Sequence, residues 1–377
     1  MNLVNTQTLL LAAVLNLLCC SSCGVLTALW RLTPDTNDYK HSPSRRIEPA
    51  AETFNFNYPA SENQLGQQLH LSLHFVQNLV TLDEFVRQYG TEAFLIIRND
   101  TILYENYPNG HHASKPVTTF SLAKAIMATL VGMAIQDGYL KNLQQPVTDF
   151  LPEFEERGFS EVTLHDLLRH TSGIRFSKSL INLNSDQVQF YYGHRLRKRM
   201  ANRSLKHPPG THFDYHSANT QLLAHILEKA TGRRLSEYLE EKIWQPLGME
   251  GEAFWSLDRK GEEGVEKAFC CLQARALDFA RIGRLWLNQG NWNGRQALPP
   301  FWMDTLMAPG PVPTGAYHCG FTLCSSPCRA YMASGLMGQI IYVAPEKQLL
   351  ILRFGEHKKE YSINFWKDIM QQVADGL

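Results

Sequence analysis

Strand-like segments near the two ends of the chain constrain its fold most strongly. Residues 93–97 and 101–105 are apolar, partly β-branched runs around a short polar turn, and residues 339–344 and 348–354 repeat this pattern. Such pairs of runs predict β-hairpins. Residues 362–373 follow with the apolar spacing of a closing helix. We therefore predict an α/β fold in which both chain ends build one antiparallel sheet flanked by helices.

The middle of the chain, from about residue 140 to 315, is predicted to be an inserted, mostly helical subdomain. Helical apolar spacing is found in residues 163–170, 220–231, 235–243 and 273–288. A helical unit inserted into an α/β unit leaves a cleft between the two, and clefts are the usual places for small-molecule sites.

The N-terminal residues indicate export. Leu9 to Leu18 form an apolar run, and small residues then precede Cys23. This resembles a bacterial secretory signal that ends in a lipidated cysteine. An uncleaved anchor reaching Trp30 is the alternative, since about 20 residues can span a bilayer. We predict a signal peptide or anchor over 1–22 and an exported protein attached to the membrane by lipid or helix.

Residues 23–60 are predicted to be a linker, and residues 61–377 to be the folded body. The linker assignment rests on the wealth of Pro, Asn, Asp and Ser between about residues 31 and 60, without an apolar period.

Charge and cysteine usage exclude several classes of partner. Lys plus Arg and Asp plus Glu both total 36, so the net charge is zero and no nucleic-acid partner is expected. The basic run 195–199 is interpreted as a solvated helix face. Beyond the N-terminal region no CxxC pair or HExxH helix occurs, so neither a metal nor another cofactor is expected. Five cysteines lie beyond the N-terminal region; an oxidising compartment would permit a disulfide among the last three, at positions 319, 324 and 328, but the odd count leaves at least one thiol over.

Ser121 and Lys124 open a long apolar helix that ends before Gly138. Residues 125–135 are apolar, Gly or Thr, so the helix is expected to be buried nearly all round. A lysine in its first turn is costly there unless its charge is paired or lost. Residues at i and i+3 share one helix face, so Lys124 can act as the base for a Ser121 nucleophile. The alternative is a helix-capping serine beside a surface lysine.

Two further segments carry candidate site residues. Tyr215 lies in the turn-rich loop 209–219 before a helix, where a tyrosine can pass protons between nucleophile and leaving group. Its alternative is a packed aromatic side chain. Gly335 lies where a strand begins, a position that allows close substrate approach and leaves a backbone N–H for an oxyanion. Without its context it is equally compatible with a bend.

Together these residues resemble the serine β-lactamase and penicillin-binding-protein superfamily. The order SxxK, a tyrosine after PxGxxFxY, and a glycine-containing strand is typical of it, and TLHDLLRHTSGI (163–174) and IWQPLGM (243–249) agree. The resemblance implies Ser121 as acyl-enzyme nucleophile, Lys124 as base and Tyr215 as the partner tyrosine. It also implies that the Ser121 amide, Ser217, Asn219, Gly335 and Gly338 face the substrate or its oxyanion.

Two departures from the family pattern concern the substrate. Ser217 stands where the family's YxN motif has asparagine, and no Lys or His lies just before Gly335, where a cation commonly holds a substrate carboxylate. Arg329 and Arg353 are the cations that could replace it. The pattern is more similar to the esterase and 6-aminohexanoate-dimer hydrolase branch, which implies a serine hydrolase acting on a small ester or amide. A peptidoglycan D,D-peptidase or β-lactamase is the alternative, and a non-catalytic binding protein of this fold is the non-enzymatic one.

We predict that the mature protein begins at a lipidated Cys23. Small residues after an apolar run allow signal cleavage there, and the lipid would then hold the chain at the membrane. Intact mass spectrometry of the protein purified from its native membrane checks this. A mass that retains the first 22 residues would favour the uncleaved anchor.

Overall fold

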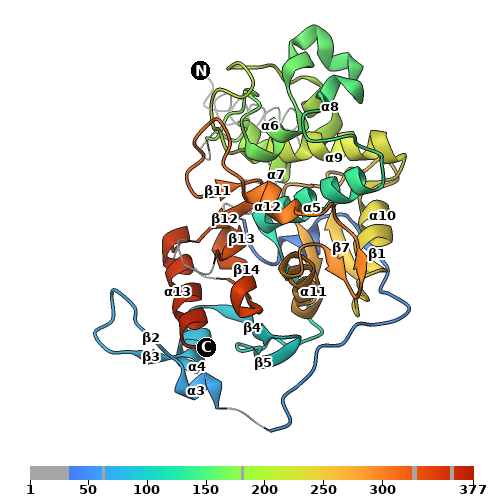
Figure 1. Ribbon diagram of the computed structural model, residues 1–377. Coiled ribbons are helices and arrows are strands. Elements are labelled where there is room, and N and C mark those ends of the chain that lie inside the picture. Colours follow the sequence, from blue (N-terminus) through green and yellow to red (C-terminus); the bar gives the residue numbers. More distant parts are fainter. Residues whose placement is uncertain (1–33, 62–63, 180–181, 325–328, 357–360) are drawn as a thin grey trace, which may run out of the picture.

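A seven-stranded antiparallel sheet forms the centre of the protein (Figure 1). The computed structural model describes residues 34–61, 64–179, 182–324, 329–356 and 361–377. The strands are, in spatial order, β11 (Tyr317–His318), β12 (Phe321–Leu323), β13 (Tyr331–Gly335), β14 (Gln339–Ala344), β15 (Leu349–Gly355), β4 (Thr91–Arg98) and β5 (Thr101–Asn106).

The two hairpins predicted from the sequence join in the middle of this sheet. β15 pairs with β4 from Leu349 opposite Arg98 to Phe354 opposite Ala93, so the C-terminal hairpin continues directly into the N-terminal one. The closing helix is α13 (Ile363–Asp375), whose first turn is capped by the Ser362 hydroxyl accepting from the Phe365 amide. The prediction of one sheet built from both chain ends is confirmed.

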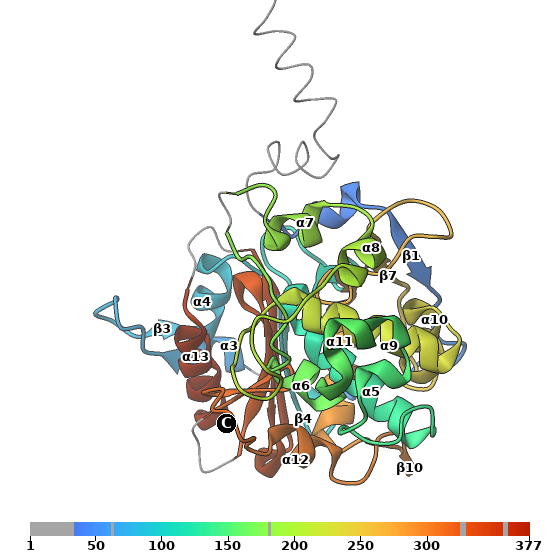
Figure 2. The same cartoon turned by 90° about the horizontal axis from the view of Figure 1, so that it is seen from above.

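Helices cover both faces of the sheet. Seen from above, α4 and α13 lie on one side, and α5, α9 and α11 lie on the other (Figure 2). The helices are α3 (Leu65–Gln68), α4 (Leu82–Gln88), α5 (Ala123–Gln136), α6 (Leu164–Arg169), α7 (Asp186–Tyr192), α8 (Leu196–Ala201), α9 (Ser217–Thr231), α10 (Leu235–Leu239), α11 (Ala276–Leu287), α12 (Trp302–Met307) and α13. Two short hairpins, β2 (His70–Leu71) with β3 (Val80–Thr81) and β9 (Asn291–Trp292) with β10 (Arg295–Gln296), complete the periphery.

A second, four-stranded sheet links the helical region to the start of α5. Its order is β1 (Ser44–Ile47), β7 (Ala253–Ser256), β8 (Leu272–Ala274) and β6 (Val117–Thr118). β6 leads within three residues to Ser121, so this small sheet sets the position of the candidate nucleophile.

The linker predicted over residues 23–60 is wrong for most of its described part. β1 pairs with β7 along its whole length, and the Phe54 amide donates to the Gly248 carbonyl at 3.0 Å. Ile47 and Phe56 are buried in the main core. The side chains of Ile47, Phe54 and Phe56 are sufficient to dock the segment on the main core, although its composition is that of a linker.

The disulfide lies outside the three cysteines among which the sequence would permit one. Cys270 and Cys271 form a disulfide between adjacent residues, whereas Cys319 and Cys324 are free, buried thiols. Cys328 lies outside the described residues, as does Cys23. Within the residues that the structure describes, no helix has the length and apolar character needed to cross a membrane.

Candidate active site

Ser121 lies in a strand–turn–helix junction between β6 and α5. The Thr119 amide donates to the Leu272 carbonyl at 3.0 Å, and the Thr119 hydroxyl accepts from the Leu272 amide at 3.2 Å, so the turn is attached to β8. Phe120 has a φ of 42°, which few non-glycine residues adopt. Unusual backbone conformations of this kind persist where neighbouring contacts enforce them, and they cluster at functional sites.

Lys124 occupies the first turn of α5, one helical turn after Ser121. Its Nζ donates to the Ser121 Oγ at 3.2 Å and to the Phe269 carbonyl at 3.0 Å. The Nζ also lies 5.0 Å from the centre of the Tyr215 ring. The side chain is 4% exposed, so the surface-lysine alternative is wrong. Because a carbonyl can only accept, it takes one Nζ hydrogen and fixes the amine beside the hydroxyl whose proton a base must remove.

Tyr215 lies in the loop before α9 and is 37% exposed, the most open of the three predicted catalytic side chains. Its ring packs on His170 with centroids 4.6 Å apart and on Tyr317 with centroids 5.4 Å apart. In the described part of the chain no hydrogen bond engages its hydroxyl. The Tyr215 hydroxyl is therefore open to a substrate, while its ring is held from behind.

His170 is a positioning residue for Tyr215. It ends α6 in the left-handed conformation, with a φ of 58°. Its Nδ1 accepts from the His216 amide at 3.3 Å and from the Asn219 Nδ2 at 2.9 Å, so the ring hydrogen belongs on Nε2. Burial, together with the neighbouring His216 and Lys124, lowers the pKa of His170 well below its ordinary value. The His170 imidazole, which packs against the Tyr215 ring, therefore stays neutral.

Asn219 does not face the substrate, contrary to the prediction. Its side chain is fully buried, and its Oδ1 accepts from the Ser172 hydroxyl at 2.5 Å while its Nδ2 donates to His170. Both ends of the amide are thus used inside the protein. The shift of asparagine from the family's position to Asn219 moves it one half-turn further along α9 and into the core. Ser217, the first residue of α9, is also buried.

Gly335 lies against the Ser121 turn. A Cβ at Gly335 would lie 2.2 Å from the Thr119 carbonyl oxygen and 3.2 Å from the Ser121 amide nitrogen, so only glycine allows β13 to come this close. The Ser121 amide donates no hydrogen bond to any group among the described residues. The end of β13 therefore lies next to the Ser121 amide, an arrangement that is compatible with an oxyanion hole made of backbone N–H groups.

Gly338, in contrast, lies away from the nucleophile. A Cβ there would lie 2.5 Å from the Trp366 ring, and its carbonyl accepts from the Arg353 Nη1 at 3.0 Å. Its φ of 76° shows that it serves the turn between β13 and β14. The substrate-facing role predicted for Gly338 does not agree with this position.

Neither candidate cation replaces the residue missing before Gly335. Arg353 is fully buried and donates to the carbonyls of Tyr89, Gly90, Met337 and Gly338. Burial lowers the pKa of Arg353 to about 9, partly offset by Glu92. Arg329 lies six residues before Gly335, beyond the opposite end of β13, which places it roughly 20 Å away at about 3.3 Å per residue. Lys178 forms an ion pair with Asp214, the residue before Tyr215.

Several functional groups were not predicted from the sequence. The Phe269 carbonyl is a backbone atom far along the chain, so no residue type marks it. Tyr317 on β11 forms the wall behind Tyr215, and burial raises its pKa well above the ordinary value, with Tyr215 adding to the effect. The network of His170, Ser172 and Asn219 could have been suspected from the HTSG turn, since buried polar side chains need partners.

The described residues contain no group of three or more His, Cys, Asp or Glu side chains close enough to hold a metal ion. The arrangement found is that of a serine hydrolase which works through an acyl-enzyme: a serine at a helix start, a buried lysine within reach of its hydroxyl, and a backbone amide beside it.

Comparison with known proteins gives the same class. The Beta-lactamase family model matches residues 82–358, and the chain belongs to this family. The 6-aminohexanoate-dimer hydrolase of Paenarthrobacter ureafaciens is 26% identical over 298 residues, which cover 73% of this chain and 75% of that protein. Esterase EstB of Burkholderia gladioli is 33% identical over 186 residues, 44% of this chain and 47% of the esterase. These relatives are hydrolases, and so is this protein.

Solved structures confirm the fold. A structure from Bacillus anthracis, provisionally named a 6-aminohexanoate-dimer hydrolase, superimposes with a TM-score of 0.78 at 23% identity, covering 90% of this chain and 92% of that one. A class C β-lactamase mutant superimposes with a TM-score of 0.56 at 18% identity, covering 76% of this chain and 91% of that one.

We predict that Asn219→Leu lowers the free energy of unfolding by about 1–3 kcal/mol, because it removes one hydrogen-bond partner each from the buried His170 Nδ1 and the Ser172 hydroxyl. Ser217→Ala is the matched control on the same helix, with an expected change below about 1 kcal/mol. Urea denaturation measures both. Unchanged stability of Asn219→Leu together with a raised KM would return Asn219 to the substrate-facing role.

Proposed function

We propose that this protein hydrolyses a small neutral ester or amide, with Ser121 as the nucleophile that carries the acyl group. The observation that carries the proposal is the contact of the buried Lys124 Nζ with the Ser121 Oγ, 3.2 Å apart, in a chain whose sequence has no Lys or His just before Gly335. The first feature supports the chemistry, and the second supports the substrate class.

In the proposed reaction, Lys124 takes the proton of the Ser121 hydroxyl as Oγ attacks the substrate carbonyl carbon. The negative charge that forms on the carbonyl oxygen is stabilised by the Ser121 amide and the backbone beside Gly335. The Tyr215 hydroxyl gives its proton to the leaving alcohol or amine and takes up the proton that Lys124 received, so that both side chains return to their starting states. Water then attacks the acyl-enzyme by the same steps in reverse, with the proton returning to Ser121 Oγ.

The substrate end near Gly335 is proposed to carry no free carboxylate. Arg353 is engaged by four backbone carbonyls, Arg329 lies at the far end of β13, and Lys178 is paired with Asp214. A carboxylate bound there would lose its water without gaining a charged partner, which is costly. The hydrolase and esterase names of two relatives agree with neutral amide and ester substrates.

We further propose that the protein works outside the cytoplasm, attached to a membrane by its N-terminal segment. The apolar run before Cys23 supports export. The Cys270–Cys271 disulfide supports it independently, because disulfides persist mainly in oxidising compartments.

A matched pair of substrates tests the substrate proposal: one ester or amide with a free carboxylate at the leaving-group end, and the same compound methylated there. The methylated compound is expected to have a kcat/KM at least equal to that of the acid, because Arg353, Arg329 and Lys178 are all held elsewhere in the described part of the chain. A charge-assisted hydrogen bond would otherwise favour the acid by about one to two decades.

Ser121→Ala serves as the background control for both compounds. A preference of about tenfold or more for the free acid would contradict the proposal, since such a factor corresponds to about 1.4 kcal/mol from a cation. It would instead favour a peptidase that recognises a C-terminal carboxylate.

A further inference from the structure

The Cys270–Cys271 disulfide lies next to the group that fixes the catalytic lysine. Phe269, whose carbonyl accepts from Lys124 Nζ at 3.0 Å, immediately precedes Cys270. The disulfide therefore closes a small ring within the same turn that presents this carbonyl. Nothing in the acyl-transfer chemistry itself requires the two sulfur atoms.

The turn is attached to its surroundings on both sides of the disulfide. The Trp255 indole donates to the Cys270 carbonyl at 3.0 Å, and the Ser256 amide donates to the Cys271 carbonyl at 3.0 Å. Upstream, the Ala268 amide donates to Gln221 Oε1 at 3.2 Å. A change at the disulfide is thus confined to the few peptide units between these attachments. The Phe269–Cys270 peptide unit, which carries the Phe269 carbonyl, is one of them.

Cys271 has a backbone conformation that few non-glycine residues adopt. Its φ is 68°, in the left-handed region, which costs a non-glycine residue roughly 1 kcal/mol or more. The covalent ring with Cys270 restrains this residue. Once the ring opens, Cys271 can relax towards ordinary φ values, and the peptide units next to it turn with it.

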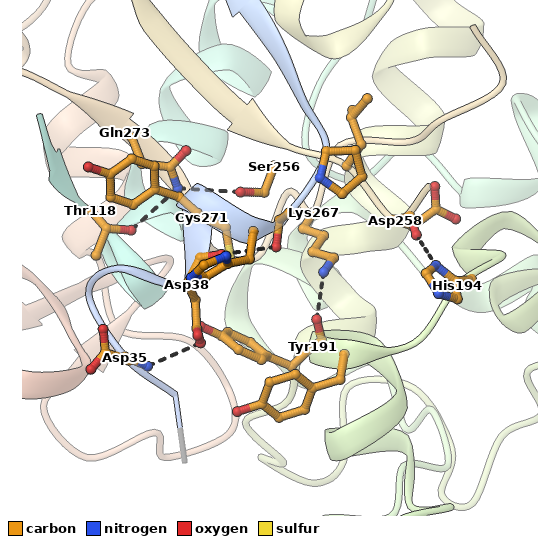
Figure 3. Close-up of a pocket in the computed structure, with 16 residues that line it drawn as sticks. Asp35, Asp38, Thr118, Tyr191, His194, Ser256, Asp258, Lys267, Cys271 and Gln273 are labelled. Carbon is orange, nitrogen blue, oxygen red and sulfur yellow. Dashed lines mark hydrogen bonds between the residues drawn. The ribbon is translucent and has the colours of Figure 1, made fainter. Parts of the chain in front are cut away.

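The sulfur of Cys271 is also next to a cavity. Figure 3 shows Cys271 in the wall of a polar pocket that Asp38, Tyr191, Lys267 and Gln273 also line. Ser121, Lys124 and Tyr215 are not among the residues that line this pocket. A small dithiol can therefore approach the disulfide without entering the space between Ser121 and Tyr215.

We propose that the Cys270–Cys271 disulfide is a positioning element for Lys124, and that its reduction by a dithiol lowers hydrolysis by displacing the Phe269 carbonyl. This rests on the proposed function of Ser121 and Lys124. In the reduction, one dithiol thiolate attacks a cysteine sulfur and breaks the S–S bond, giving a mixed disulfide. The second dithiol sulfur then displaces the remaining cysteine. Two electrons and two protons pass to Cys270 and Cys271, and the dithiol leaves as its cyclic disulfide.

The test compares the full-length protein in its oxidised state, after incubation with dithiothreitol, and after reoxidation. The mass gain of two hydrogens verifies reduction, and thermal unfolding verifies that the protein is folded. On a neutral ester, reduction is expected to lower kcat about 10- to 100-fold at nearly unchanged KM, because a small misplacement of a catalytic group acts on the chemical step. The acidic limb of the kcat pH profile is expected to move as well, and reoxidation to restore both.

Cys270→Ser/Cys271→Ser is the matched variant, because it removes the ring without a reductant. It is expected to have the activity of the reduced protein and to be insensitive to dithiothreitol. Cys324→Ser, which changes a free thiol on the other face of the sheet, is expected to respond to dithiothreitol as the wild type does.

Wild-type kcat and an unchanged pH profile in a folded double variant would overturn the inference, as would equal activity of verified oxidised and reduced protein. If dithiothreitol fails to reach the bond, the double variant alone decides. Failure of the proposed function has a different signature, because the oxidised wild type would then hydrolyse no neutral ester above the Ser121→Ala background.

Discussion

The position of one amine determines how the rest of this site works. Lys124 Nζ is held between the Ser121 hydroxyl and the Phe269 carbonyl inside a helix that is buried on every side. Such a lysine is tolerated only where its hydrogens find acceptors. The two acceptors lie in turns that are far apart in the sequence. One is the Ser121 turn, which Thr119 attaches to β8, and the other is the turn at Cys270–Cys271. The small four-stranded sheet therefore fixes the positions of both turns relative to each other.

The site separates groups that touch the substrate from groups that orient them. The proposed chemistry is carried by Ser121, Lys124 and Tyr215. Tyr215 is oriented by His170, which packs against its ring, and His170 is in turn held by Asn219. The low pKa of His170 belongs to this second role, because a neutral ring can pack against the tyrosine without adding a charge next to Lys124. Arg353 likewise has a structural role, because it donates to the carbonyls of two turns and is therefore not free to bind a substrate carboxylate.

Local patterns in the sequence predicted the elements that depend on neighbouring residues. The hairpins of β4–β5 and β14–β15, the buried helix α5 and the Ser121–Lys124 contact all follow from spacings of a few residues. The predictions that failed, and the contacts that were missed, depend on the direction of a side chain or on residues far apart in the sequence. The motif could not show that the Asn219 side chain points into the core, and the Phe269 carbonyl lies 145 positions from Lys124 and has no side-chain signature. The segment containing Ile47 and Phe56 has too few apolar residues to reveal that it docks.

The account stands on Ser121 being activated by Lys124, and covalent labelling tests this most directly. A fluorophosphonate probe is incubated with wild type, Ser121→Ala and Lys124→Met, all shown to be folded, and the modified peptide is identified by mass spectrometry. We expect the label on Ser121, none at this site in Ser121→Ala, and a labelling rate reduced about 100-fold or more in Lys124→Met, because a general base contributes factors of about 10² to 10⁴. A label on a different residue, or wild-type labelling rates in Lys124→Met, would contradict the account.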